Sequence, residues 1–237
     1  MNIIFMRHGE ATDNVKEIIS DKEIYWSVLT ENGKKTVSES IEALPKKIDK
    51  IYVSPFPRTI ETAHFVFEKY PMADFVIEQR LREIKNGKYS GKKNNEDLDK
   101  TREKQIAGDY FVRFGEYGEN KFDIEFRLCE FLLDVYENNF NNNTVMFVSH
   151  GSITSYMKRI LKIKTPHIKT GKIEEFIDVD FTPLFKHIKK LKDIKAAKIR
   201  ERVKQINSLN ININLKENLI KMIKKEFNNI EFSDNYF

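Results

Sequence analysis

The sequence lacks several features that would each indicate a class of protein. Its single cysteine, Cys129, excludes a disulfide within the chain and suits a reducing compartment. The apolar N-terminal stretch meets Arg7 at once, so it is too short for a membrane span or the core of a signal peptide. There is no internal repeat and no glycine- and serine-rich linker. We therefore expect a cytoplasmic protein, with no membrane association, built around one substantial core.

A strong charge excess is also missing from most of the chain. Lys and Arg total 41 against 36 Asp and Glu, and nine of these basic residues lie between Phe185 and Ile206, where only two acidic residues occur. The rest of the chain is therefore slightly acidic. The length of 237 residues suits one α/β domain and an extension. We predict a catalytic domain at residues 1–182 and a basic, mainly helical extension at residues 183–237.

Apolar runs and their spacing predict alternating strands and helices. Strands are expected at residues 2–6, 48–53, 75–77 and 144–148. Helices are expected at residues 30–44, from Pro57 to about residue 67, at about 95–110, 122–136 and 153–161, and in the tail from 184 and at 214–228. This alternation predicts an α/β fold, a three-layer αβα sandwich with a largely parallel central sheet, followed by a C-terminal helical extension.

Two His-Gly pairs each follow a predicted strand, His8-Gly9 after the first and His150-Gly151 after the last. Because parallel strands place their carboxyl ends at one edge of a sheet, the two histidines can lie side by side. A neutral imidazole can attack phosphorus with one nitrogen while the other donates a hydrogen bond that fixes the tautomer. Arg7, at a strand end, and Arg58, in the first turn of a helix, are placed to bind phosphoryl oxygens bidentately.

Further short motifs surround these residues along residues 1–165. In chain order they are Arg7-His8-Gly9-Glu10 with Thr12 and Asn14, Leu29-Thr30-Glu31-Asn32-Gly33, Ser54-Pro55-Phe56-Pro57-Arg58-Thr59 with Thr62-Ala63, Leu81-Arg82-Glu83 with Gly87 and Gly91, Gly118-Glu119 with Asp123 and Arg127, and Ser149-His150-Gly151. As an ordered set they resemble the histidine phosphatase superfamily, in the branch that contains phosphoglycerate mutases and many small-metabolite phosphatases.

The resemblance implies a role for each matched residue. His8 would become phosphorylated, and Glu83 would protonate the leaving oxygen and later activate water. The phosphoryl group would be held by Arg7, Arg58, His150 and Gly151, with Asn14 lining the pocket. The implied activity is metal-independent hydrolysis of phosphate monoesters of a small phosphorylated metabolite, with no cofactor. The segment between Asn86 and Asn120, which would select the substrate, has no motif that identifies it.

Two other functions stay open. A mutase is the alternative within enzymes, although the mutase subgroup usually carries Arg-His-Tyr-Gly after its acid and this chain has Ile84-Lys85-Asn86-Gly87-Lys88-Tyr89, which favours hydrolysis. A regulatory or binding protein could instead use the basic C-terminal helix, but that helix lacks the interleaved aromatics typical of nucleic-acid binding. We expect the tail helices to pack on the back face of the domain or on another subunit, rather than to close over the pocket as a lid. Packing on another subunit would give a homo-oligomer.

The remaining histidines and the cysteine have simpler interpretations. His64, among apolar residues of a predicted helix, is expected to pack in the core, and His167 and His187 are expected at the surface. Cys129 lies on an apolar helical stripe and is expected to be a small buried side chain. His8-Gly9-Glu10 matches the His-x-Glu of zinc deaminases, but one cysteine cannot supply their Cys-x-x-Cys pair.

Overall fold

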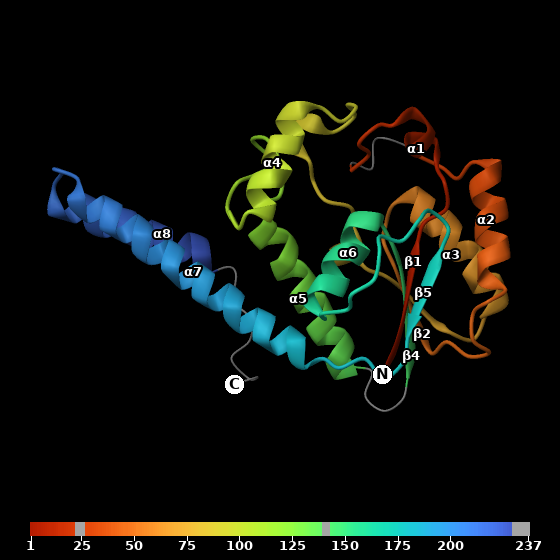
Figure 1. Ribbon diagram of the computed structural model, residues 1–237. Coiled ribbons are helices and arrows are strands. Elements are labelled where there is room, and N and C mark those ends of the chain that lie inside the picture. The colour runs from red at the N-terminus through yellow and green to blue at the C-terminus, as the bar shows by residue number, and fades with distance from the viewer. Residues whose placement is uncertain (22–26, 139–142, 229–237) are drawn as a thin grey trace. The chain divides into compact units, whose positions relative to one another are not determined.

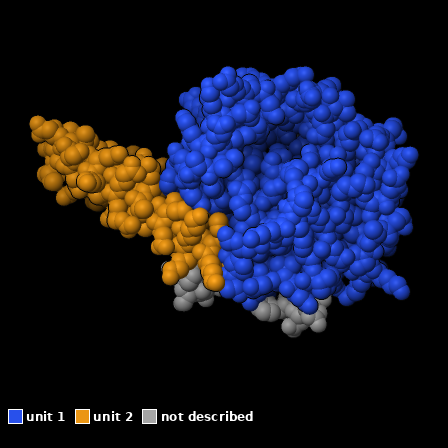
Figure 2. Space-filling model, in the orientation of Figure 1, with its two compact units in different colours: residues 1–184 blue, residues 185–237 orange. Residues whose placement is uncertain are grey.

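The computed structural model describes residues 1–21, 27–138 and 143–228. Its chain divides into two compact units, residues 1–184 and residues 185–237 (Figure 2). The first unit contains every strand that the structure describes, together with helices α1 to α6. All residues that the sequence nominates for chemistry lie in this first unit.

A five-stranded sheet forms the centre of the first unit, in the order β3-β2-β4-β1-β5. Its strands are β1 (Asn2–Arg7), β2 (Lys50–Val53), β3 (Asp74–Ile77), β4 (Thr144–Ser149) and β5 (Ile173–Phe176). The first four are parallel, as the sequence predicts, whereas β5 pairs antiparallel with β1 and was not predicted. Apolar and polar residues do not alternate in its sequence, Ile-Glu-Glu-Phe, as they do in a half-buried strand. The strand is therefore recognised only by its pairing with β1.

Helices cover both faces of the sheet, with α2 and α3 on one face and α5 and α6 on the other (Figure 1). Their bounds are α1 (Thr12–Lys16), α2 (Glu31–Ile41), α3 (Pro57–Lys69), α4 (Glu96–Ile106), α5 (Lys121–Asn138) and α6 (Gly151–Ile160), with short 3-10 turns η1 (Gln79–Leu81) and η2 (Gly87–Tyr89). Alternate residues of β1 face opposite layers: Ile4 packs with Val37 of α2, while Phe5 packs on Phe147 of β4, whose ring contacts Phe131 of α5. The predicted αβα sandwich with a largely parallel sheet is confirmed.

The start of each helix beside the first sheet face follows from its sequence. The Thr30 hydroxyl accepts a hydrogen bond from the Gly33 amide at 3.0 Å and caps α2, which ends at Ile41 rather than at residue 44. Pro57 occupies the first turn of α3, where its missing N–H costs nothing. The prediction that His64 packs in the core was wrong: α3 buries the stripe that includes Ala63 and Val66, and His64 lies on the exposed face beside Glu68.

The second unit contains most of α7 (Thr182–Ser208) and all of α8 (Ile213–Asn228). The two helices are joined by an ion pair of 2.8 Å between Arg202 and Glu226. Among the described residues, no helix is both long and apolar enough to cross a membrane. Assembly through this unit stays a prediction.

Candidate active site

The two predicted His-Gly pairs meet at the carboxyl edge of the sheet. Arg7 of β1 lies opposite Ser149 of β4, so His8 and His150, the next residues along, emerge side by side. Their ring centroids are 5.3 Å apart. His8 is 3% exposed and His150 is fully buried. The sheet therefore brings together two imidazoles that are 142 positions apart in the chain.

The loop that carries His8 is held by the two neighbouring helices. The Gly9 amide donates to the Thr62 hydroxyl of α3 at 3.0 Å, and the Thr30 amide donates to the Glu10 carbonyl at 2.9 Å. Gly33 packs directly on this loop, because a Cβ at Gly33 would lie 2.1 Å from the Glu10 carbonyl oxygen. The motif around Thr30 and Gly33 thus holds the backbone of the loop that carries His8.

The hydrogen bonds of His8 define its tautomer. Its Nδ1 lies 2.8 Å from the Gly9 carbonyl oxygen, which can only accept, so Nδ1 carries the proton. Arg58 Nε, which can only donate, lies 3.2 Å from His8 Nε2. Burial, followed by the charge of Arg58, lowers the pKa of His8 well below its ordinary value. His8 is therefore a neutral imidazole whose Nε2 lone pair faces a guanidinium.

Arg58 lies at the centre of this cluster and is 2% exposed. Its Nη2 donates to the Ser20 carbonyl at 2.9 Å and to His150 Nδ1 at 3.1 Å. Its Nη1 lies 3.7 Å from a carboxylate oxygen of Asp13. Since Nδ1 of His150 accepts from Arg58, the proton of that ring is on Nε2, which donates to the Ser54 hydroxyl at 2.8 Å. Arg58 is thus fixed in position by groups from four separate segments.

Arg7 presents a second guanidinium, held at one end. Its Nη1 donates to His167 Nε2 at 3.0 Å and to the Ile168 carbonyl at 3.2 Å. Its Nε is buried and has no hydrogen-bond partner among the described residues. The predicted surface position of His167 agrees with its exposure, but its contact with Arg7 was not foreseen.

Glu83 supplies the carboxyl group of the cluster. One carboxyl oxygen accepts from the Ile84 amide at 2.8 Å, and the other lies 4.0 Å from His150 Nδ1. Its side chain is 18% exposed. Burial raises the pKa of Glu83, although the backbone hydrogen bond from Ile84 and the charges of Arg58, Arg127 and Arg7 oppose that rise. This is the direction that a general acid at neutral pH requires.

A cavity of about 180 Å³ opens onto these groups. Five predicted residues line it: Arg7, His8, Asn14, Arg58 and Glu83. The predicted His150 and Gly151 are not among its lining residues, and His150 is connected to the cavity through its hydrogen bond with Arg58. Residues that sequence reasoning missed also line it, among them Ser20, Arg102 of α4 and Phe114. Among the described residues, no group of three or more His, Cys, Asp or Glu could hold a metal ion.

A buried ion-pair network supports the segment that carries Glu83. Glu119 accepts from Arg127 Nε at 2.8 Å, from Arg82 at 2.9 Å and from the Lys85 amide at 2.9 Å. These bonds fix the backbone on both sides of Glu83. The motif residues Glu119 and Arg127 therefore contribute to the site by positioning, at a distance from the cavity. Cys129 is buried on α5, as predicted.

A sequence profile of the histidine phosphatase superfamily (branch 1) matches residues 3–175. The chain belongs to this superfamily. It is 41% identical over 95 residues to a 2,3-bisphosphoglycerate-dependent phosphoglycerate mutase of Thermoplasma acidophilum, a match that covers 39% of this chain and 46% of that protein. The chain therefore matches less than half the length of this curated relative.

Solved structures of superfamily members share the fold. A mycobacterial glucosyl-3-phosphoglycerate phosphatase superposes with a TM-score of 0.62 at 18% identity, over 73% of this chain and 90% of that one. A phosphoserine phosphatase from Entamoeba histolytica, solved with 3-phosphoglyceric acid, gives a TM-score of 0.61 at 24% identity, over 74% and 90% of the two chains. The superfamily includes both phosphatases and mutases, so family membership leaves the reaction open.

Proposed function

We propose that this chain hydrolyses phosphate monoesters of a small metabolite by transferring the phosphoryl group to His8 Nε2. One observation carries the proposal: a neutral imidazole with its lone pair on Nε2 stands beside two guanidinium groups and a carboxyl group whose pKa is raised by burial. A nucleophile, fixed cations and an acid are the groups that monoester cleavage requires.

In the first step the His8 Nε2 lone pair attacks phosphorus and the bond from phosphorus to the ester oxygen breaks. The electron pair goes to the ester oxygen, and Glu83 gives it a proton. In the second step Glu83, now a carboxylate, removes a proton from water as the water oxygen attacks the phosphohistidine. The bond from phosphorus to Nε2 then breaks, which returns the electron pair to His8 and releases phosphate.

The cations supply the electrostatic part of the reaction. Arg58 Nε donates to His8 Nε2 at 3.2 Å in this structure, so it must turn to a phosphoryl oxygen when Nε2 attacks. The guanidinium of Arg7, which also lines the cavity, provides a second positive charge. The α6 helix begins at Gly151, and its first-turn amides add positive potential near the cavity, which Ser152 lines. Charge-assisted hydrogen bonds of this kind are each worth about 1.5–3 kcal/mol.

The shape and charge of the cavity support a small anionic substrate. Its volume of about 180 Å³ suits a metabolite better than a polymer. Arg102 lines it from α4; its side chain is 39% exposed, and its guanidinium donates to Asp99 at 2.9 Å and to Asn94 at 3.3 Å. A substrate that carries a carboxylate or a second phosphate could pair with Arg102 while its ester phosphate lies between Arg7 and Arg58.

A phosphoglycerate mutase reaction is the second candidate, favoured by the 41% identity to the Thermoplasma acidophilum mutase over 95 residues. A mutase returns the phosphoryl group to the substrate instead of to water. The discriminating experiment incubates the full chain, without added metal, with a panel of phosphorylated metabolites that includes 3-phosphoglycerate, and measures both free phosphate and isomerised product. Hydrolysis predicts phosphate release without isomerisation. Isomerisation that depends on 2,3-bisphosphoglycerate, with little phosphate released, would establish the mutase instead.

A further inference from the structure

The segment between α6 and β5 passes directly beside Arg7. The Arg7 amide donates to the Lys172 carbonyl at 3.2 Å, and the Gly171 amide donates to the His8 carbonyl at 2.9 Å. This pairing continues into the antiparallel contact of β1 with β5. His167 is therefore brought to the Arg7 side chain, although it is 160 positions away in the chain.

A chain of hydrogen bonds with a fixed direction runs through the His167 ring. Arg7 Nη1 can only donate, so His167 Nε2 accepts from it at 3.0 Å. The proton of a neutral ring must then be on Nδ1, which lies 3.0 Å from the Ser155 hydroxyl oxygen. That hydroxyl in turn donates to the Gly151 carbonyl at 2.8 Å. His167 thus connects Arg7 to the first turn of α6 through one tautomer.

The His167 ring also packs on Gly151, which has no side chain. A Cβ at Gly151 would lie 2.6 Å from His167 Cε1 and Nε2 and 3.1 Å from Arg7 Cζ. A side chain at position 151 would therefore displace the His167 ring, and both this ring and the Arg7 guanidinium lie against the backbone of Gly151. Packing and hydrogen bonding fix the same arrangement of the three residues.

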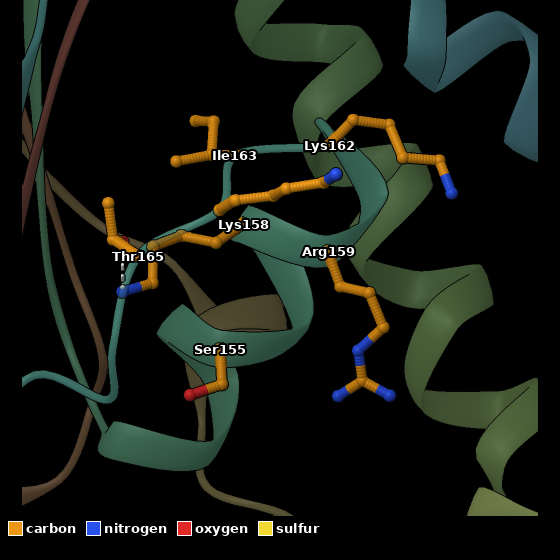
Figure 3. A pocket seen from close by; sticks show the side chains of 7 residues that line it. Ser155, Lys158, Arg159, Lys162, Ile163 and Thr165 are labelled. Carbon is orange, nitrogen blue, oxygen red and sulfur yellow. Dashed lines mark hydrogen bonds between the residues drawn. The ribbon is translucent and has the colours of Figure 1, made fainter.

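A buried lysine anchors the segment that carries His167. Lys158 of α6 is 3% exposed, and its Nζ donates to the Thr165 hydroxyl at 2.9 Å, to the Pro166 carbonyl at 2.6 Å and to Glu174 of β5 at 2.8 Å. Figure 3 shows the Lys158 side chain reaching Thr165 along the wall of a hollow of about 380 Å³, while Arg159 and Lys162 point elsewhere. The two residues before His167 are therefore held to both α6 and β5.

We propose that His167 is a positioning residue for Arg7: its neutral ring accepts from Nη1 and so holds the Arg7 guanidinium at the cavity, where it would bind the phosphoryl group. The proposal rests on the proposed function, in which Arg7 binds that group. It requires His167 to keep its lone pair on Nε2, so a proton on that nitrogen would break the bond and place two cations in contact. Phosphoryl binding by Arg7 should weaken as His167 becomes protonated.

The charged groups that face His167 come from three elements. They are Arg7 of β1, Lys158 of α6 and Glu174 of β5. Burial, then the charges of Arg7 and Lys158, lower the pKa of His167, and Glu174 opposes this. The neutral ring is therefore favoured at neutral pH. We expect His167 to become protonated only as the pH falls below the ordinary pKa of a histidine.

The test compares His167→Ala and His167→Gln with the wild-type chain, with His64→Ala on the exposed face of α3 as the matched control. Loss of one charge-assisted hydrogen bond predicts that His167→Ala lowers kcat/KM about tenfold and weakens inorganic phosphate binding about as much. His167→Gln should stay within about threefold of wild type, because its amide oxygen can accept from Arg7. The ratio of wild-type to His167→Gln kcat/KM should fall from pH 7 to pH 5, since other titrations are common to both.

The outcomes separate this proposal from the proposed function. Equal kcat/KM in wild type and His167→Ala, equal losses in the Ala and Gln variants, or a ratio that is flat with pH would each overturn the positioning role. A wild-type chain that releases no phosphate from any ester, yet binds inorganic phosphate with the predicted dependence on His167, would refute the hydrolase function and support the positioning role. Failure to bind phosphate at all would overturn both.

Discussion

Lowering the pH from 7.5 to 5.0 should destabilise the folded chain, because His8 and His150 are both buried as neutral imidazoles. Burial, and then the charge of Arg58, lowers the pKa of each ring well below its ordinary value. The unfolded chain binds protons at both rings below about pH 6.5, whereas the folded chain does not. Stability is therefore fully present above that pH and decreases as the pH falls.

The size of this loss of stability can be worked out for each buried histidine ring. If a ring stays neutral in the folded state down to pH 5.0, protonation of the unfolded state lowers the free energy of unfolding by about 2 kcal/mol over this range. Two rings together give about 4 kcal/mol, a large fraction of the roughly 5–15 kcal/mol that typically stabilises a protein. Glu83 acts in the opposite direction, because its raised pKa makes the folded state bind the extra proton.

The assay is urea unfolding at several pH values in a Glu83→Gln background, which removes the opposing titration. His150→Gln in that background should reduce the pH dependence by about 2 kcal/mol between pH 7.5 and 5.0. His64→Gln, at an exposed position of α3, controls for the loss of one histidine. A pH dependence that is unchanged by His150→Gln would refute the interpretation of these rings as buried neutral groups.

Two further predictions concern Glu83 and Arg102. Glu83→Gln removes the proton donor, so kcat for alkyl phosphates should fall by about 10²–10⁴. The kcat for an aryl phosphate should fall far less, because its phenolate leaves without being protonated. Equal losses of kcat on both substrates would count against the assignment. Arg102→Gln should raise KM about tenfold for a phosphate ester that carries a second anionic group, because that group loses a charge-assisted hydrogen bond with Arg102. The KM for an ester without a second anionic group should stay unchanged. An equal change in both KM values would contradict this role of Arg102.

The sequence predicts those parts of the fold and site that depend on local pattern. His8 and His150 each follow a short apolar run, and parallel strands bring such ends together. Pro57 marks the first turn of α3 and so places Arg58 at the sheet edge. These signals depend on strand runs and helix starts, which side chains encode within a few residues of the position concerned.

The remaining parts depend on contacts between distant segments. Ser20 holds Arg58 chiefly through its backbone carbonyl at 2.9 Å, which any residue could supply, and only at 3.4 Å through its hydroxyl, so the side-chain pattern does not reveal this contact. Arg102 lies on a polar helix where charged residues are ordinary. His167 reaches Arg7 only because β5 turns back along β1, and β5 has no alternating pattern. His64 was misplaced because apolar neighbours in sequence do not define which face of a helix is buried.

The central claim is that the phosphoryl group passes through His8 Nε2, and rapid acid-free quenching during turnover tests it most directly. The full chain is mixed with a radiolabelled ester that it hydrolyses, quenched in base, digested and mapped by mass spectrometry. We expect base-stable, acid-labile phosphate on the peptide that contains His8, and none on that peptide in His8→Gln, which should also lose turnover. Phosphate release at the wild-type rate by His8→Gln, with no phosphohistidine trapped in either protein, would contradict the account.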